Sequence, residues 1–404
     1  MPGLVELHER AAEKFAIKKR MKAKTTILVI TVSMFFTGIC PAANFDSGST
    51  GADGLLNVTS NMTLSVPTNG IFNLATITIA SGATLSFSNN ALNTPVYLLA
   101  TSDVLITGAI SVSGNSPQGF QGGFGGPGGF RGGNGGFALN TTAGDGFGPG
   151  AGQGSGARGV FGTNYANALL VPIIGGSGGA GVNGSPGRGG AGGGGAILIA
   201  SNTKITVNGI VYARGGNAAD DCDTGNYGAG SGGAIRVVAP IINGSGELDT
   251  LGGLFHGRDQ SFHNCASARR YASSGRVRVD CLDRDAFRNL NYVGTTTRGS
   301  QMFVFPSIIP KLNITEAAGT SIPESAGQPV AIELPVGSST NQVVRVQARN
   351  FTNDVPITVV VTPENGSSRT FSTNISLLSG SPPSVAVSVI IPSGTVNRIH
   401  AWTQ

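Results

Sequence analysis

The fold is decided by the stretch Gly192-Gly-Gly-Gly-Ala-Ile-Leu-Ile-Ala200, which leads through Lys204-Ile-Thr-Val-Asn-Gly209 into Ile210-Val-Tyr-Ala-Arg-Gly-Gly216. Further along, the chain repeats this pattern as Gly230-Ser-Gly-Gly-Ala-Ile-Arg-Val-Val-Ala-Pro240, followed by Ile241-Ile-Asn-Gly-Ser-Gly-Glu-Leu-Asp-Thr-Leu-Gly-Gly253. An earlier copy occupies residues 96–114. Repeats of short apolar runs separated by glycine-rich turns are typical of stacked rungs, each of which buries its inner face on the next.

Alternation within each copy predicts strands that have one buried face. The copies align on three anchor glycines, Gly108, Gly209 and Gly246. Two residues after each glycine stands an aliphatic residue, and these residues are Ile110, Val211 and Leu248. The outward positions are expected to be Ser111, Ser113, Tyr212, Arg214, Glu247 and Asp249. Because side chains alternate with period two in a strand, we predict an all-β protein whose residues 44–306 form a parallel β-solenoid (β-helix) of the usual right-handed kind.

Composition and charge narrow the classes of partner. The chain has 404 residues, 64 of them glycine; 40% are hydrophobic and only 12% are charged. So little charge argues against a disordered chain, which is normally charge-rich. Residues 1–43 hold seven Lys/Arg and three Asp/Glu, so they supply +4 of the net charge of +5. The rest of the chain is nearly neutral, and we therefore expect no nucleic-acid partner.

Residues 1–43 have the organisation of an export signal. Met21-Lys-Ala-Lys-Thr-Thr26 is a charged segment, Ile27–Ile39 is an apolar run, and Cys40-Pro-Ala-Ala43 supplies small residues for cleavage. We interpret this region as a signal peptide with an N-terminal extension, in which either Met1 or Met21 is the start. The apolar run is shorter than the roughly 20 residues that a membrane helix needs. The sequence thus predicts a secreted or cell-surface protein that has no membrane span.

Three glycine-rich insertions are expected to interrupt the solenoid, at residues 114–195, 217–233 and 254–274. Within the first, Gln121-Gly-Gly-Phe-Gly-Gly-Pro-Gly-Gly129 repeats every three residues, which matches the three residues per turn of polyproline II. A flexible glycine linker is the alternative interpretation. Interleaved phenylalanines are unusual in a solvated linker, and they favour an ordered pack of extended segments on the flank of the solenoid.

Beyond Pro310 the composition changes, and short alternating runs recur between turn residues. The expected strands are Val330–Leu334, Val343–Ala348, Ile357–Val361, Arg369–Ser372, Val385–Ile391 and Arg398–Trp402. Regular short strands of this kind predict a small immunoglobulin-like β-sandwich over residues 311–404. We expect Phe351 and Trp402 to belong to its core rather than to a sugar-binding platform.

Three cysteines follow the leader. Cys222 precedes Ala234 by twelve residues and Cys265 precedes Arg276 by eleven, so both lie at equivalent places in adjacent insertions. In an exported protein this spacing predicts a Cys222–Cys265 disulfide. Cys281 is left without a partner, and its sequence context does not say whether it is buried or reactive.

The insertions also collect polar residues that could form a site. Asp221 and Asp223 are candidate Ca²⁺ ligands, although a solvated acidic turn is the alternative because the segment is shorter than an EF-hand loop and lacks its distal Glu. No other cofactor is expected. The next insertion contributes four residues that could act as acids, bases or anchors on a polysaccharide, namely His256, Asp259, His263 and Arg269.

Ala196–Ser201, Gly232–Pro240 and Gly275–Val279, together with the opening Phe45–Asp53, give the chain a family resemblance. It resembles bacterial exported glycine-rich β-solenoid proteins of unassigned function. The resemblance covers most of residues 44–404 and implies fold and location, without implying an activity. A looser likeness to right-handed β-helices includes both pectate-lyase-like enzymes and surface adhesins.

Two functions are therefore compared. The first is a non-catalytic cell-surface or extracellular-matrix protein that acts in adhesion or scaffolding, with glycans, other surface proteins or itself as partners. The alternative is a polysaccharide lyase or hydrolase that uses the 217–233 and 254–274 insertions. A third hypothesis, the subunit of a filament, predicts exposed rung edges at one end of the solenoid.

Overall fold

The computed structural model describes residues 45–136, 142–155, 158–163, 165–184, 187–218, 228–256, 269–283 and 288–403. The predicted leader lies outside these ranges. Strands make up nearly all the regular structure, and helix within the described residues is confined to one short 3-10 turn at residues 288–289. No helix among them is long and apolar enough to cross a membrane.

Most strands belong to three parallel sheets. Sheet 1 has the order β1 (Leu55–Val58), β4 (Thr76–Ile79), β7 (Val104–Ile106), β12 (Lys204–Val207), β15 (Ile241–Asn243). Sheet 2 has the order β2 (Met62–Ser65), β5 (Thr84–Ser88), β8 (Ala109–Ser111), β13 (Ile210–Tyr212), β16 (Glu247–Asp249), β20 (Asn291–Val293). Sheet 3 has the order β21 (Thr295–Gly299), β19 (Arg276–Cys281), β14 (Ala234–Ala239), β11 (Ala196–Ser201), β6 (Val96–Ala100), β3 (Ile71–Leu74).

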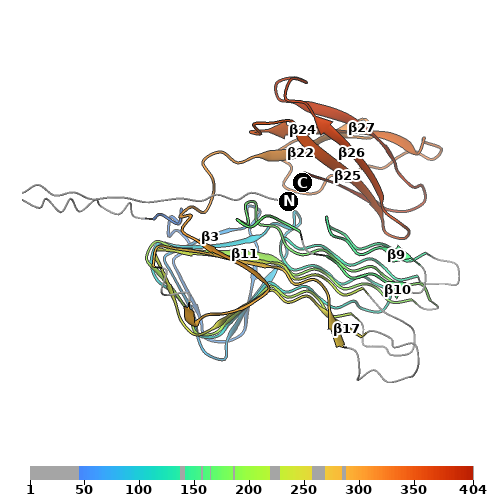
Figure 1. Cartoon of the computed structure of the whole chain (residues 1–404). Coiled ribbons are helices and arrows are strands. Elements are labelled where there is room, and N and C mark those ends of the chain that lie inside the picture. The colour runs from blue at the N-terminus through green and yellow to red at the C-terminus, as the bar shows by residue number, and fades with distance from the viewer. Residues whose placement is uncertain are drawn as a thin grey trace, which may run out of the picture. The chain divides into compact units, whose positions relative to one another are not determined.

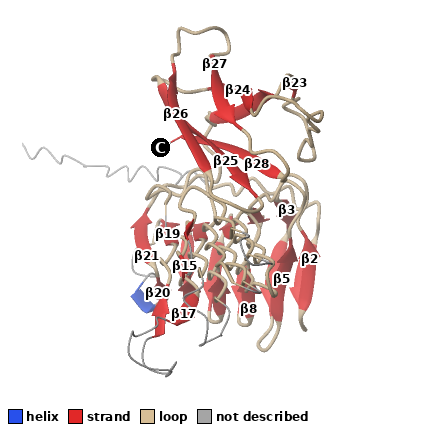
Figure 2. Ribbon diagram, turned by 90° about the vertical axis from the view of Figure 1, so that its right-hand side faces the viewer, coloured by secondary structure: helices blue, strands red, loops and turns tan. Residues whose placement is uncertain are grey.

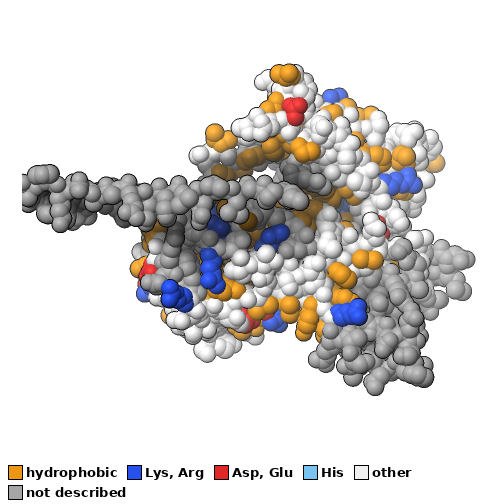
Figure 3. Space-filling model, in the orientation of Figure 1, with side chains coloured by type: hydrophobic (Ala, Val, Ile, Leu, Met, Phe, Trp, Pro, Cys, Tyr) orange, Lys and Arg blue, Asp and Glu red, His pale blue; other side chains and the backbone are white. Residues whose placement is uncertain are grey.

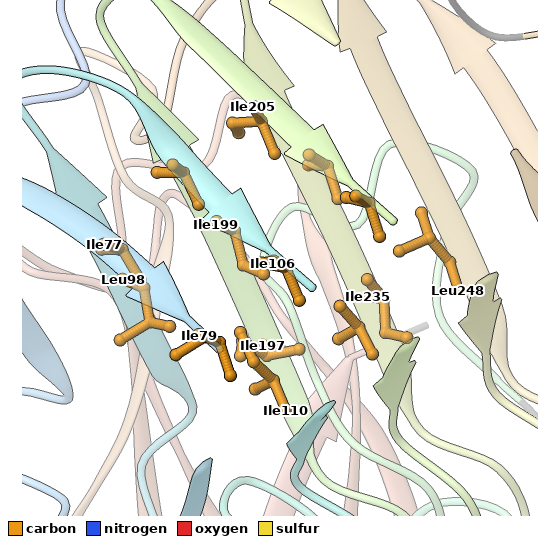
Figure 4. Close-up of a cluster of buried hydrophobic side chains, with 14 of the residues drawn as sticks. Ile77, Ile79, Leu98, Ile106, Ile110, Ile197, Ile199, Ile205, Ile235 and Leu248 are labelled. Carbon is orange, nitrogen blue, oxygen red and sulfur yellow. The ribbon is translucent and has the colours of Figure 1, made fainter. Parts of the chain in front are cut away.

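From β1 to β19 the chain visits the three sheets in turn, and each visit adds one strand beside the previous one. The described residues then add β20 to sheet 2 and β21 to sheet 3. Val211 of β13 is the Cα partner of Ile110 in β8 and of Leu248 in β16, and all three side chains are 0% exposed. The predicted register and shared interior of these residues are therefore confirmed. Figure 1 shows the three sheets as the sides of a triangle, and Figure 4 shows aliphatic side chains from successive strands meeting inside it.

Glycine is required where the chain turns from sheet 1 to sheet 2. A Cβ atom added at Gly209 would overlap the carbonyl oxygen of Gly108, and one added at Gly246 would overlap that of Gly209. The anchor glycines thus form a column in which backbones of successive rungs touch, which only a residue without a side chain allows. This contact explains why the repeats align on these glycines.

Each insertion lies between a strand of sheet 2 and the next strand of sheet 3. They follow β8, β13 and β16 and lead into β11, β14 and β19. Their extended backbone segments pack side by side beyond the three sheets (Figure 1). We call this region the glycine stack, and its described residues are 113–136, 142–155, 158–163, 174–184, 187–195, 213–218, 228–233, 250–256 and 269–275.

Residues 187–195 run through the middle of the glycine stack and bond in three directions. The N–H groups of Gly190 and Gly193 donate to carbonyls of residues 133 and 130, both at 2.8 Å. Those of Ala191 and Gly194 donate to residues 228 and 231 at 2.8 and 2.9 Å, and that of Gly192 donates to residue 115 at 2.9 Å. Every third residue therefore points the same way, as in a pack of polyproline II-type helices. The predicted order of this region is confirmed for its described residues.

Two antiparallel sheets follow the parallel region. Their strand orders are β23 (Thr320–Ser321), β22 (Lys311–Ala317), β24 (Asn341–Arg349), β27 (Ser384–Ile390), and β26 (Arg369–Ile375), β25 (Val355–Pro363), β28 (Asn397–Thr403). They share a core separate from that of the parallel sheets. The expected strand at Val330–Leu334 was wrong, because residues 322–340 carry no strand. Pro329 and Pro335 flank this run, and proline cannot donate to a ladder.

Candidate functional site

The turns at which the extended glycine segments reverse direction meet at one end of the glycine stack. Gly136 N–H donates to Val182 O at 3.1 Å, and Gly187 N–H donates to Gly136 O at 2.6 Å. Ala218 N–H donates to Leu254 O at 2.9 Å, which joins the second insertion to the third. We call this end the stack tip. Its described residues are 118–121, 134–136, 142–144, 153–155, 158–161, 181–184, 187–189, 217–218, 228–229, 254–256 and 269–272.

Two short hairpins and a small aromatic core support part of the stack tip. β9 (Gly154–Ser155) pairs with β10 (Arg158–Gly159), and β17 (Leu254–His256) pairs with β18 (Arg269–Tyr271). The rings of Phe161 and Phe255 stack with centroids 5.2 Å apart, against Ala229 and Ala272. Tyr271 remains 53% exposed beside this core. The stack tip thus combines a rigid base with accessible aromatic surface.

The candidate site residues from the sequence fall mainly outside the described ranges. These are Asp221, Cys222, Asp223, Asp259, His263 and Cys265. The backbones of His256 and Arg269 are described, and the two residues are Cα partners in the β17–β18 pair. The insertions that carry the whole set are neighbours, since Leu254 N–H also donates to the Asn217 side chain at 2.8 Å. The disulfide, the Ca²⁺ site and the catalytic patch all remain predictions.

Three charged side chains form a buried cluster that the sequence analysis did not single out. Arg236 of β14 is 1% exposed, and its guanidinium donates to Asp280 Oδ2 at 3.2 Å and to Phe303 O at 2.9 Å. Arg278 donates to Asp280 Oδ1 at 2.6 Å, and Asp280 also accepts the Gln301 N–H at 3.0 Å. Burial lowers the pKa of Arg236, while Asp280 opposes that effect. We call Arg236, Arg278 and Asp280 the arginine clasp, because they hold residues 301–304 on sheet 3.

The sequence carried a signal for the arginine clasp. Inward valines alternate with outward charges in Arg276-Val-Arg-Val-Asp280, and Arg236 occupies an outward position on the neighbouring strand in register with Arg278. Opposite charges on adjacent strands could have predicted the cluster. The burial could not be predicted, because it depends on the returning segment 301–304. That segment places Phe303 with its ring centroid 4.9 Å from the Arg236 guanidinium.

A second set of polar side chains joins the antiparallel sheets to the glycine stack. Figure 2 shows β25 and β28 of these sheets next to loops of the parallel region. Asp145, only 3% exposed, accepts both the N–H and the hydroxyl of Ser368, at 2.8 and 2.6 Å. Glu364 forms an ion pair with Arg131 and accepts the Asn134 amide at 3.0 Å. Arg398 of β28 approaches the other oxygen of Glu364 at 3.4 Å.

An aromatic cluster lies next to these ion pairs. The His400 ring stacks on Trp402 at 6.0 Å between centroids, and it meets Phe130 and Phe147 of the glycine stack edge-on at 6.1 and 6.4 Å. Burial, with a smaller contribution from Arg398, lowers the pKa of His400 to about 4. Phe351 packs against the core of the antiparallel sheets, as expected. Trp402 differs, since it is only partly buried and packs on His400.

The exposed fractions of Asp249 and Cys281 answer two further questions that the sequence raised. Asp249, expected to face solvent, is 0% exposed because Arg214 pairs with it and the Leu251 N–H donates to it at 2.8 Å. Cys281 is a buried free thiol with its Sγ 3.2 Å from the carbonyl oxygens of Pro240 and Asp283. Burial raises the pKa of this thiol, which makes it less reactive.

Neither set of charged groups has the composition of a metal centre. Within the described ranges, no group of three or more His, Cys, Asp or Glu side chains could hold a metal ion. Among the described residues on the face in Figure 3, charged side chains are few and most of the surface is uncharged. No protein-family model matches the chain, and neither does any curated protein or solved structure.

Proposed function

We propose that the chain is an exported, non-catalytic protein of the cell surface or extracellular matrix, which binds its partners through the stack tip. The observation that carries this proposal is the convergence of the glycine-segment returns at one end of an ordered stack. Loops held together by a rigid scaffold are a common arrangement for recognition surfaces. Glycine segments supply the scaffold, because their backbones bond to several neighbours and no side chain separates them.

The architecture behind this proposal is a right-handed parallel β-helix followed by an immunoglobulin-like sandwich. Support for the β-helix comes from the order in which the chain visits sheets 1, 2 and 3, and from the aliphatic interior between them. Support for the sandwich comes from two antiparallel sheets that share one core. The proposed domains are the leader at 1–43, the β-helix at 44–306 and the sandwich at 311–404.

Binding of purified mature protein to glycan arrays, bacterial and host cells, and itself tests the function. We expect binding that falls at least about tenfold when Tyr271, an exposed residue of the stack tip, is replaced by serine. Leu378→Ser is the control, since Leu378 is 95% exposed and lies outside the stack tip. A chelator arm tests whether the predicted Ca²⁺ ligands contribute. N-terminal sequencing of secreted protein tests cleavage near Ala42 or Ala43.

The enzyme alternative draws on one observation, the pairing of His256 with Arg269 across β17 and β18. Incubating the same protein with plant and microbial polysaccharides, and assaying new reducing ends and unsaturated products, separates the two functions. Robust turnover that His256→Gln or Asp259→Asn abolishes, without detectable binding in the arrays, would replace adhesion with catalysis.

A further inference from the structure

His400 lies between the glycine stack and its own strand. Phe130 and Phe147 approach it from the stack, Trp402 stacks on it from β28, and Val360 of β25 is its Cα partner. Val360 is 8% exposed, so the ring has apolar neighbours from each of these elements. Within the part of the chain that the structure describes, no carboxylate forms an ion pair with the imidazole. A charge on this ring would therefore have little compensation.

The charged groups around His400 come from three elements. Arg398 stands on the same strand, with its guanidinium 5.7 Å from the centroid of the Phe147 ring. Arg131 of the glycine stack lies 5.1 Å from the same centroid. Glu364, immediately after β25, already pairs with both arginines, and the Asp145 carboxylate accepts hydrogen bonds from Ser368 and from the Gly154 N–H. A proton on His400 would place a third positive charge beside two guanidinium groups.

We propose that this junction is an acid-sensitive latch: the antiparallel sheets stay docked on the glycine stack while the His400 imidazole is uncharged, and they undock when it gains a proton. Aromatic rings attract a cation. Here the lost hydration of the imidazolium, followed by its repulsion by Arg398, outweighs that attraction. After undocking, the sheets remain tethered, because the arginine clasp holds residues 301–304 on sheet 3 independently of His400.

The direction of the pH effect follows from the two protonation states. In the docked form, burial and then Arg398 lower the pKa of His400 from its ordinary 6.5 to about 4. Undocking removes the part of this burial that Phe130 and Phe147 provide, so the undocked form binds the proton more tightly. Stabilisation of the docked form is complete above the ordinary value and is lost as the pH falls from 6.5 towards 4. If undocking restores the ordinary pKa in full, the docking constant at about pH 5 is about 20-fold lower than at about pH 7, which is the largest effect that this one group can have.

The chain carries its own reporter for the test, because Trp402 is its single tryptophan. Full-length mature protein is titrated from about pH 8 to about pH 5, with acrylamide quenching of Trp402 emission and the radius of gyration from small-angle scattering measured at each step. We expect both to rise together as the pH falls. Scattering separates undocking from local quenching of the tryptophan by a protonated imidazole.

Matched variants identify the titrating group. His400→Gln and His400→Phe cannot gain the proton, and we expect both to keep the dimensions of the neutral-pH protein at about pH 5. His256→Gln, which removes a histidine outside the junction, is expected to behave like the wild type. A wild-type scattering profile that stays unchanged down to about pH 5 would overturn the proposal, and so would the same acid transition in both His400 variants.

Discussion

Replacing Gly193 by alanine adds one methyl group, yet it should destabilise the glycine stack strongly. A Cβ atom at this position would lie closer than 3.0 Å to Gly176 O, Gly176 C and Ser177 N, all of which are backbone atoms. Relief requires the segments 187–195 and 174–184 to separate. That movement breaks the hydrogen bonds from Gly176 to Gly194 and from Gly179 to Ala191, now 2.7 and 2.9 Å.

The expected loss in the free energy of unfolding has two parts, the cost of overpacking and the loss of hydrogen bonds. Inserting a methyl group into a closely packed site costs about 1–3 kcal/mol, and each of two hydrogen bonds contributes about 1 kcal/mol. We therefore expect Gly193→Ala to lower the free energy of unfolding by about 3–5 kcal/mol. Gly327→Ala is the matched control, because nothing lies within 4 Å of a Cβ there. It should change stability by less than about 1 kcal/mol.

Urea denaturation of the mature protein, followed by circular dichroism, measures both variants against the wild type. Equal midpoints for Gly193→Ala and Gly327→Ala would refute the close packing of the glycine stack. A large loss at Gly193 with no change at Gly327 is the expected pattern. Protease digestion of the native variants should show cleavage within the first insertion only for Gly193→Ala.

Three further predictions concern buried side chains. Arg236→Ala should destabilise the protein by about 3 kcal/mol, since it leaves Asp280 with Arg278 as its one charged partner and removes the donor to the Phe303 carbonyl, and limited proteolysis should then cut near residues 299–306. Peptide mapping of the secreted protein without reduction should recover Cys222 linked to Cys265, and separate peptides would contradict that pairing. Because burial raises its pKa, Cys281 should react with a thiol reagent only after unfolding, whereas rapid reaction in the native protein would exclude its burial.

Much of the parallel region could be predicted because its signals are local. Alternation places Ile110, Val211 and Leu248 inward, and the anchor glycines fix their register, so strands and core follow from a short alignment. The three-residue glycine period likewise predicted an ordered stack. Both patterns repeat, and each repetition adds an independent observation of the same geometry.

The sequence failed where burial depends on distant segments. The alternation places Asp249 on the outward face, and it does point away from the aliphatic core. It is nevertheless buried, because Arg214 and the local backbone cover it. Val330–Leu334 has strand-like alternation, yet the prolines at its ends prevent pairing. Neither the burial of the arginine clasp nor the His400 junction could be predicted, because each depends on segments that return to the parallel region after β19.

Amide hydrogen exchange of the central glycine segment tests the account most directly. Residues 187–195 should exchange about as slowly as β11 at Ala196–Ser201, because the N–H groups of residues 187 and 189–195 donate to neighbouring segments at 2.6–3.0 Å. Exchange of residues 187–195 within seconds, at the rate of an unstructured glycine linker, would contradict the ordered stack and with it the rigid base of the stack tip.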